Sequence, residues 1–141
     1  MNLTKEPESI SEKKKLARQL HEELKKIMAK KKETNWEEGK ILYYFDHYKL
    51  YDFLMKGHIS KFIAWKEMGI PPSTAQFKIS LYSFYIVQHH FSLEELNGAS
   101  EKKLHRAIPL IKDKPKEAIG MVIREAKKSE VRLEEFRKVV G

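Results

Sequence analysis

Small polar side chains between residues 73 and 80 have the types and the spacing that a helix needs to read DNA bases. At about 100° per residue, Ser73, Gln76 and Ser80 project from one side of a helix that begins near residue 72, with Phe77 beside them. Glutamine can pair with adenine through two hydrogen bonds, serine reaches phosphates or base edges, and phenylalanine can touch a thymine methyl group. The expected base-reading residues are Ser73, Thr74, Gln76, Phe77 and Ser80.

The other side of this helix is apolar, which indicates that it packs on a core. Its inward residues are expected to be Ala75, Ile79, Tyr82 and Ile86, flanked by Leu81 and Tyr85. A break at residues 68–72 precedes the helix, because Gly69 can take the positive φ that ends a helix and proline suits the first turn of the next one. Ser73 or Thr74 is expected to cap that next helix. Two helices joined by such a turn form a helix-turn-helix, which we predict for residues 61–91.

Cations for the DNA backbone lie both inside and beyond the predicted helix-turn-helix. Residues 36–91 hold 6 basic and 5 acidic residues, so this part is almost neutral although the chain carries a net charge of +8. Most of the attraction for a polyanion is therefore expected from the flanking segments. The expected backbone contacts are Lys61, Lys66, Lys78, Lys102, Lys103 and Arg106.

The first predicted helix, residues 10–32, carries a regular apolar stripe among lysines and glutamates. This helix can dock on the rest of the chain through the stripe, lie along DNA phosphates, or pair with a second copy of the chain. A dimer is expected because a lone helix-turn-helix reads few bases and two-fold pairing doubles the site. The candidate dimer contacts are Leu16, Leu20, Leu24 and Ile27.

The remaining segments also have helical patterns, and no segment alternates as a strand does, so the chain is predicted to be all-α. Residues 36–55 are apolar nearly all round, which is typical of a central core helix, and Asn35 is its expected cap. Ser92 and Ser100 are expected to cap two helices, ending near residues 97 and 112.

Proline and serine punctuate the C-terminal third of the chain. Pro109 is expected to kink or shorten its helix, and further helices are expected over residues 116–128 and 129–140, the last capped by Ser129. The predicted whole is a compact multi-helix fold in three parts. These are a basic amphipathic helix (residues 1–35), a helix-turn-helix core (36–91) and a C-terminal helical subdomain (92–141).

Several function classes receive no support from the sequence. There is no cysteine, and the adjacent His89 and His90 point apart on a helix, so we expect no metal and no cofactor. No glycine-rich phosphate loop, nucleophile elbow or HExxH motif occurs, so we expect neither an enzyme nor a small-molecule substrate. No apolar run approaches the roughly 18 residues of a membrane span and no signal peptide is evident, so a cytoplasmic protein is expected.

The order of these motifs resembles a group of DNA-binding proteins from plasmids, phages and integrative elements. In that group an aromatic-rich helix starting near Trp-x-x-Gly, here Trp36 to Gly39, precedes a Gly-Ile/Val-x-x-Ser-Thr-Ala turn, here Gly69 to Ala75. A segment like Ser100 to Ile111 and a helix like Leu133 to Val140 follow. The middle and C-terminal parts are also similar to the helical DNA-binding domain of partition ParB-type proteins. The resemblance covers roughly residues 36–140.

This resemblance implies a sequence-specific binder of double-stranded DNA, acting in transcriptional control, replication or segregation of a mobile element. The competing hypothesis is a helical protein–protein adaptor whose basic N-terminal helix docks an acidic partner. Such an adaptor would not retain DNA at moderate salt, and changes in Leu16, Leu20 or Leu24 would impair it. RNA binding is a third hypothesis, but the exposed aromatic platform that it usually needs is missing from the sequence.

Overall fold

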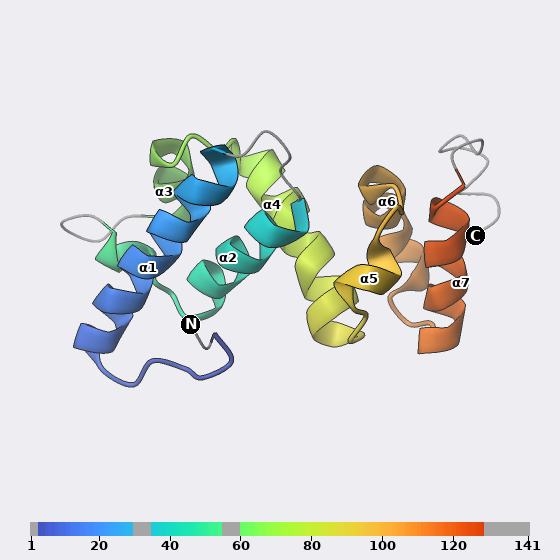
Figure 1. Cartoon of the computed structure of the whole chain (residues 1–141), viewed down its shortest axis with the longest axis horizontal. Coiled ribbons are helices and arrows are strands. Elements are labelled where there is room, and N and C mark those ends of the chain that lie inside the picture. The colour runs from blue at the N-terminus through green and yellow to red at the C-terminus, as the bar shows by residue number, and fades with distance from the viewer. Residues whose placement is uncertain (1–2, 30–34, 55–59, 129–141) are drawn as a thin grey trace. The chain divides into compact units, whose positions relative to one another are not determined.

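The computed structural model describes residues 3–29, 35–54 and 60–128, and within these ranges it contains helices and no strand (Figure 1). The predicted all-α class is therefore confirmed. The chain divides into two compact units, residues 1–79 and residues 80–141. The boundary thus falls inside the predicted helix-turn-helix and not at residue 91. No boundary falls at residue 35, because the N-terminal helix shares the core of the first unit.

The first unit contains four α-helices in its described residues: α1 (Ile10–Ala29), α2 (Asn35–His47), α3 (Lys61–Glu67) and most of α4 (Pro72–Leu81). A short 3₁₀ helix, η1 (Tyr51–Phe53), follows α2. The second unit contains a π-helical continuation of α4, η2 (Tyr82–Gln88), and then α5 (Leu93–Leu96), α6 (Glu101–Ile111) and α7 (Lys116–Ala126). The predicted helix over residues 129–140, with its cap Ser129, lies outside the described residues.

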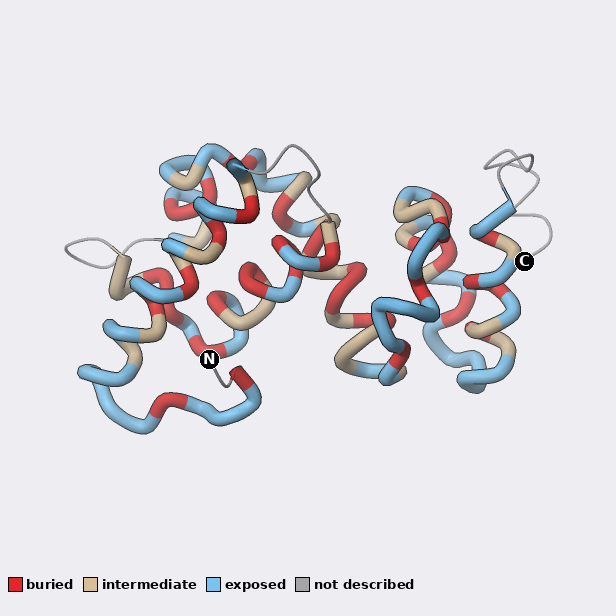
Figure 2. Tube along the Cα trace, in the orientation of Figure 1, coloured by how far each residue is buried: buried red, intermediate tan, exposed pale blue. Residues whose placement is uncertain are grey.

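The apolar stripe of α1 lies in the core of the first unit, where α1 packs against α2. Leu20, Leu24 and Ile27 are buried and Leu16 is half-buried. Figure 2 shows that buried residues recur along α1. Burial of each of the three buried side chains contributes roughly 1.5–3 kcal/mol to stability. The dimer contact predicted for this stripe is therefore corrected, because the chain's own core already covers it. Of the three uses considered for this helix, docking through the stripe is the one observed.

Helix α2 ends at His47, eight residues before the predicted end at residue 55. Lys49 takes a left-handed conformation (φ 53°), and the Leu50 N–H donates to the Phe45 carbonyl at 2.9 Å. This hydrogen bond is the one that closes a Schellman motif, which glycine usually allows. The sequence prediction missed this end because a lysine occupies the left-handed position. Asn35 is the first residue of α2 and not its cap.

Aromatic rings fill the centre of the first unit. The Trp65 side chain is fully buried, and its Nε1–H donates to the Tyr51 hydroxyl oxygen at 2.9 Å. The ring of Tyr51 stacks on that of Phe45 with centroids 5.5 Å apart. Burial raises the pKa of Tyr51, so its hydroxyl stays protonated. Both polar atoms of this pair are thereby satisfied inside the core.

One ion pair is buried in the first unit, between the Lys78 ammonium on α4 and the Glu38 carboxylate on α2. Glu38 is 1% exposed and Lys78 is 8% exposed. This finding corrects the role predicted for Lys78, because an ammonium held against an internal carboxylate does not reach a DNA phosphate. It also rotates the buried side of α4 relative to the prediction. Ala75, which was predicted to face inward, and Leu81, which was predicted to flank that side, are both buried. Ile79 was also predicted to face inward but is only half-buried.

The second unit is held by caps and hydrogen bonds between helices. Ser92 and Glu95 form a capping box at the start of α5, and the Ser100 hydroxyl accepts from the Lys103 N–H at the start of α6. Both predicted caps are thus confirmed. The Tyr85 hydroxyl donates to the Leu104 carbonyl at 2.6 Å, which ties η2 to α6. Pro109 lies inside α6, which continues to Ile111.

We expect Lys78→Met to lower the free energy of unfolding by about 3–5 kcal/mol, because Glu38 would remain as an unpaired buried charge. The double variant Lys78→Met with Glu38→Met should recover most of this loss, since two apolar groups can replace a buried pair. Urea unfolding followed by tryptophan fluorescence measures this, because both tryptophans, Trp36 and Trp65, lie in the first unit. The exposed Lys40 on α2 supplies the control Lys40→Met, which should change stability by less than about 0.5 kcal/mol. A similar small effect of Lys78→Met would show that the ion pair does not hold α4.

Candidate nucleic-acid interface

The turn between α3 and α4 is built as the sequence predicts. Ser60 caps α3, its hydroxyl accepting from the Ile63 N–H at 3.3 Å. Helix α3 ends at Glu67, and Gly69 takes the predicted left-handed conformation with φ 79°. The Ile70 N–H donates to the Trp65 carbonyl at 2.9 Å and the Gly69 N–H to the Lys66 carbonyl at 3.0 Å. These two bonds form a Schellman motif, and Ile70 is buried beneath it.

Helix α4 starts two residues earlier than a cap at Ser73 requires. Pro72 is its first residue, and the Pro71 carbonyl accepts from the Ala75 N–H at 3.0 Å. Ser73 and Thr74 therefore lie inside the first turn, where their hydroxyls are not in the cap position. The predicted capping role is therefore corrected.

Three of the five predicted reading residues lie on the side of α4 opposite its anchor Lys78, whereas Thr74 and Phe77 lie nearer to the anchored side. At about 100° per residue, Ser73, Gln76 and Ser80 are each about 140–160° from Lys78 around the helix. Ser73 and Gln76 are exposed, whereas Thr74, Phe77 and Ser80 are half-buried. Ser80 begins the second unit, one turn beyond Gln76 along the same helix. The exposed part of the predicted set is thus its N-terminal half.

The cations predicted for the first unit have three different environments. Lys66 is exposed and has no acidic partner among the described residues. Lys61 lies 3.7 Å from the Asp46 carboxylate, with its ammonium 5.6 Å from the centre of the Trp65 ring. Lys78 is buried in its ion pair. Of the three, Lys66 alone combines exposure with a lack of an internal acidic partner in the described ranges.

In the second unit, the three cations on α6 that were predicted to contact the DNA backbone also differ in exposure. Lys102 and Arg106 are exposed. Lys103 is 7% exposed, and its ammonium donates to the Lys128 carbonyl at 2.9 Å. The phosphate-binding role predicted for Lys103 is therefore corrected, because this ammonium links the two ends of the α6–α7 pair.

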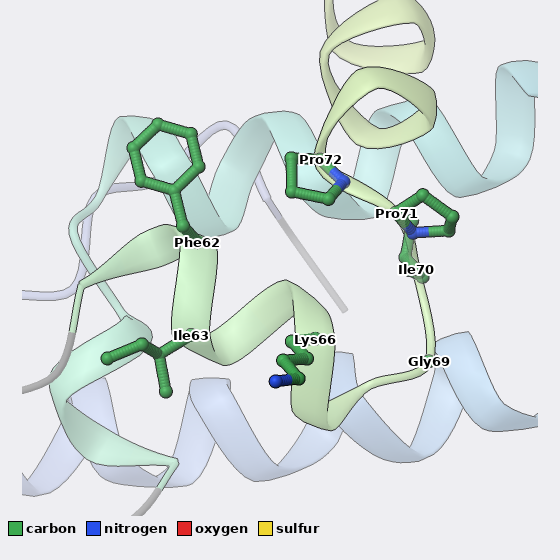
Figure 3. Close-up of a pocket in the computed structure, with 7 residues that line it drawn as sticks. All are labelled: Phe62, Ile63, Lys66, Gly69, Ile70, Pro71 and Pro72. Atoms are coloured by element: carbon green, nitrogen blue, oxygen red, sulfur yellow. The ribbon is translucent and has the colours of Figure 1, made fainter.

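Two exposed apolar residues on α3 were missed by the sequence analysis. Phe62 is 48% exposed and Ile63 is 51% exposed. They lie at a surface groove of about 480 Å³ that continues over the turn into α4 (Figure 3). The groove is lined mainly by Phe62, Ile63, Ile70, Pro71, Pro72 and Lys66. No clear signal for them is present in the sequence, because α3 has seven residues, of which the structure buries Ala64 and Trp65.

The described residues contain no group of three histidine, aspartate or glutamate side chains placed to hold a metal ion. In the same residues, no helix is both long and apolar enough to cross a membrane. Comparison of the chain with protein-family models, with curated proteins and with solved structures finds no match.

Replacing Gly69 with alanine should lower the free energy of unfolding by about 1–2 kcal/mol, because an L-residue strains at φ 79°. An added Cβ meets no atom within 4 Å, so the loss would come from the backbone alone. The matched control is Gly120→Ala in α7, whose Cβ would make an ordinary 3.9 Å contact with the Phe91 ring. This control should gain up to about 1 kcal/mol from its helix position. Urea unfolding followed by circular dichroism compares the two, and equal effects would contradict the role of the left-handed turn.

Proposed function

We propose that the protein is a sequence-specific binder of double-stranded DNA, with α3 and α4 as its helix-turn-helix. The observation that carries the proposal is the orientation of α4. Its Lys78 side is anchored to Glu38, and this leaves Ser73 and Gln76 exposed at the beginning of the helix. A helix presented by its N-terminal residues is the form that enters a major groove, where its first N–H groups and its dipole also favour phosphate.

The exposed side chains support specific roles in such a complex. Gln76 would pair with adenine through two hydrogen bonds, and Ser73 would reach a phosphate or base edge. Lys66, one turn before the break, would contact the backbone as a point charge. Lys102 and Arg106 remain candidate phosphate contacts of the second unit. Thr74, Phe77 and Ser80 are less accessible, so any role of theirs in reading would be secondary.

The proposal includes pairing of two copies, since one reading helix contacts few base pairs. The stripe on α1 is not the interface, because it lies in the core. In line with the resemblance of its motifs, the protein would act in the cytoplasm in transcriptional control, replication or segregation of a mobile element. These roles share one measurable requirement, which is preference for a particular duplex sequence.

Selection of bound sequences from random duplex DNA, at about 150 mM salt to weaken non-specific attraction, should enrich a motif with two-fold symmetry. On that motif, Gln76→Ala should cost about 1–3 kcal/mol of binding free energy, because a paired base edge loses its partner. On random DNA the same variant should bind as tightly as the original chain. The control is Gln88→Ala, an exposed glutamine of η2. Equal losses on both DNAs would exclude base reading by Gln76, and failure to enrich any sequence would refute the proposed function.

Removal of the Lys66 charge should act differently from removal of the Gln76 amide. Lys66→Gln should weaken binding to every duplex by a similar factor, and should reduce the slope of log affinity against log salt by about 1. Fluorescence anisotropy over a salt series measures both quantities. Lys78→Gln is an unsuitable comparison because it unpairs Glu38, so Lys40→Gln on the exposed side of α2 serves as the control. A loss confined to the selected motif would assign Lys66 to base reading instead.

A further inference from the structure

The groove around the turn is an apolar surface that no described part of the chain covers. It is lined by the side chains of Phe62 and Ile63 on α3, by the two prolines before and in α4, and by Ile70, which lies next to Pro71 (Figure 3). Phe62 and Ile63 are adjacent and each is about half exposed. Other large apolar residues of α3 and the turn, Trp65 and Ile70, are buried. Neighbouring exposed apolar side chains lining a groove are typical of a site that binds another molecule.

The charges around this groove are positive. Lys66 is its one charged lining residue, and it has no acidic partner in the described part of the chain. The first turn of α4, a helix of ten residues, adds the positive end of a helix dipole beside Pro72. Glu67 is exposed on α3 but does not line the groove. An occupant with a carboxylate would therefore find a cation and the positive end of a helix dipole next to an apolar surface.

We propose that this groove binds an acidic, apolar peptide segment of another protein. Large apolar side chains of the segment would cover Phe62 and Ile63, and a carboxylate beside them would pair with Lys66. Burial of apolar area would supply most of the affinity, and the ion pair would select acidic segments and speed association. This site differs from the basic N-terminal helix considered for an adaptor, and the proposal does not depend on DNA binding.

A second copy of the chain fits the same groove less well. Pairing two copies around a two-fold axis at Ile63 would bring the Lys66 side chains of both copies to one small interface. An acidic segment meets attraction where a second copy meets repulsion.

The test is selection of peptides from a random displayed library on the full-length chain at about 150 mM salt. Enriched peptides should combine aromatic or leucine residues with aspartate or glutamate. Synthetic copies of them, measured by fluorescence anisotropy, should bind Ile63→Ser and Lys66→Glu at least about tenfold more weakly than the original chain. Ile63 is the chosen apolar position, because the Phe62 ring also packs edge-on against Trp65 with centroids 5.5 Å apart.

Two matched controls separate the groove from general effects. Met121→Ser removes an apolar side chain that is 64% exposed on α7, and Lys40→Glu makes the same change of charge on α2. Both should change peptide affinity less than about twofold, and circular dichroism should show that all variants are folded. The proposal is overturned if no peptide is enriched, or if enriched peptides bind Ile63→Ser as tightly as the original chain. It is also overturned if Ile63→Ser dissociates a homodimer in sedimentation, since a second copy would then occupy the groove.

Discussion

The ion pair between Glu38 and Lys78 decides which side of α4 faces solvent. Taking two charges out of water is costly, and a well-packed apolar pair in their place is often as stable, so the pair is not justified by stability alone. The effect of the pair on the orientation of α4 is clearer than its effect on stability. Apolar burial is non-directional, whereas an ammonium and a carboxylate must come within hydrogen-bond distance of each other. The pair therefore fixes α4 on α2 with Gln76 pointing outward.

The second constraint is the turn at Gly69, which follows the end of α3. With only seven residues, α3 buries Ala64 and Trp65 and leaves Phe62 and Ile63 on the surface. Trp65 is a large anchor for so short a helix, and its Nε1–H is satisfied by Tyr51. One buried aromatic residue can hold a short helix in position, so the helix can expose its other apolar side chains to solvent. This division explains how the turn can carry both the exposed start of α4 and an apolar groove.

Features set by local chemistry were predictable from the sequence, and features set by tertiary pairing were not. Ser92 and Ser100 cap their helices as predicted, because a cap needs only its own side chain and the N–H groups of the next turn. The left-handed Gly69 was predictable for the same reason, whereas the left-handed Lys49 was not, because lysine gives no signal for that conformation.

The burial of charged side chains was also not predictable from the sequence. Lys78 reads as a surface cation in a helix of mixed pattern, and only its pairing with Glu38, forty residues earlier, places it inside. Lys103 was misplaced in the same way, since its partner is a backbone carbonyl at residue 128. The periodicity of α1 predicted its buried stripe but not what covers it. A leucine stripe has the same pattern whether it meets its own chain or another copy.

These internal pairings also limit how the chain could bind DNA. Lys78 is buried against Glu38 and Lys61 lies in a partly exposed pair with Asp46, so Lys66 is the cation beside the exposed start of α4 that has no acidic partner in the described residues. Each phosphate contact contributes to affinity through released counterions, so one copy with a single such contact would bind weakly through this motif. Exposed cations elsewhere in the first unit can add to it, and Lys14, Lys15 and Arg18 on α1 surround one shallow depression. A motif that selects a sequence but is only weakly attracted to phosphates favours a complex in which two copies of the reading helix are linked. Linking two weak sites gives an overall affinity far above that of either site alone.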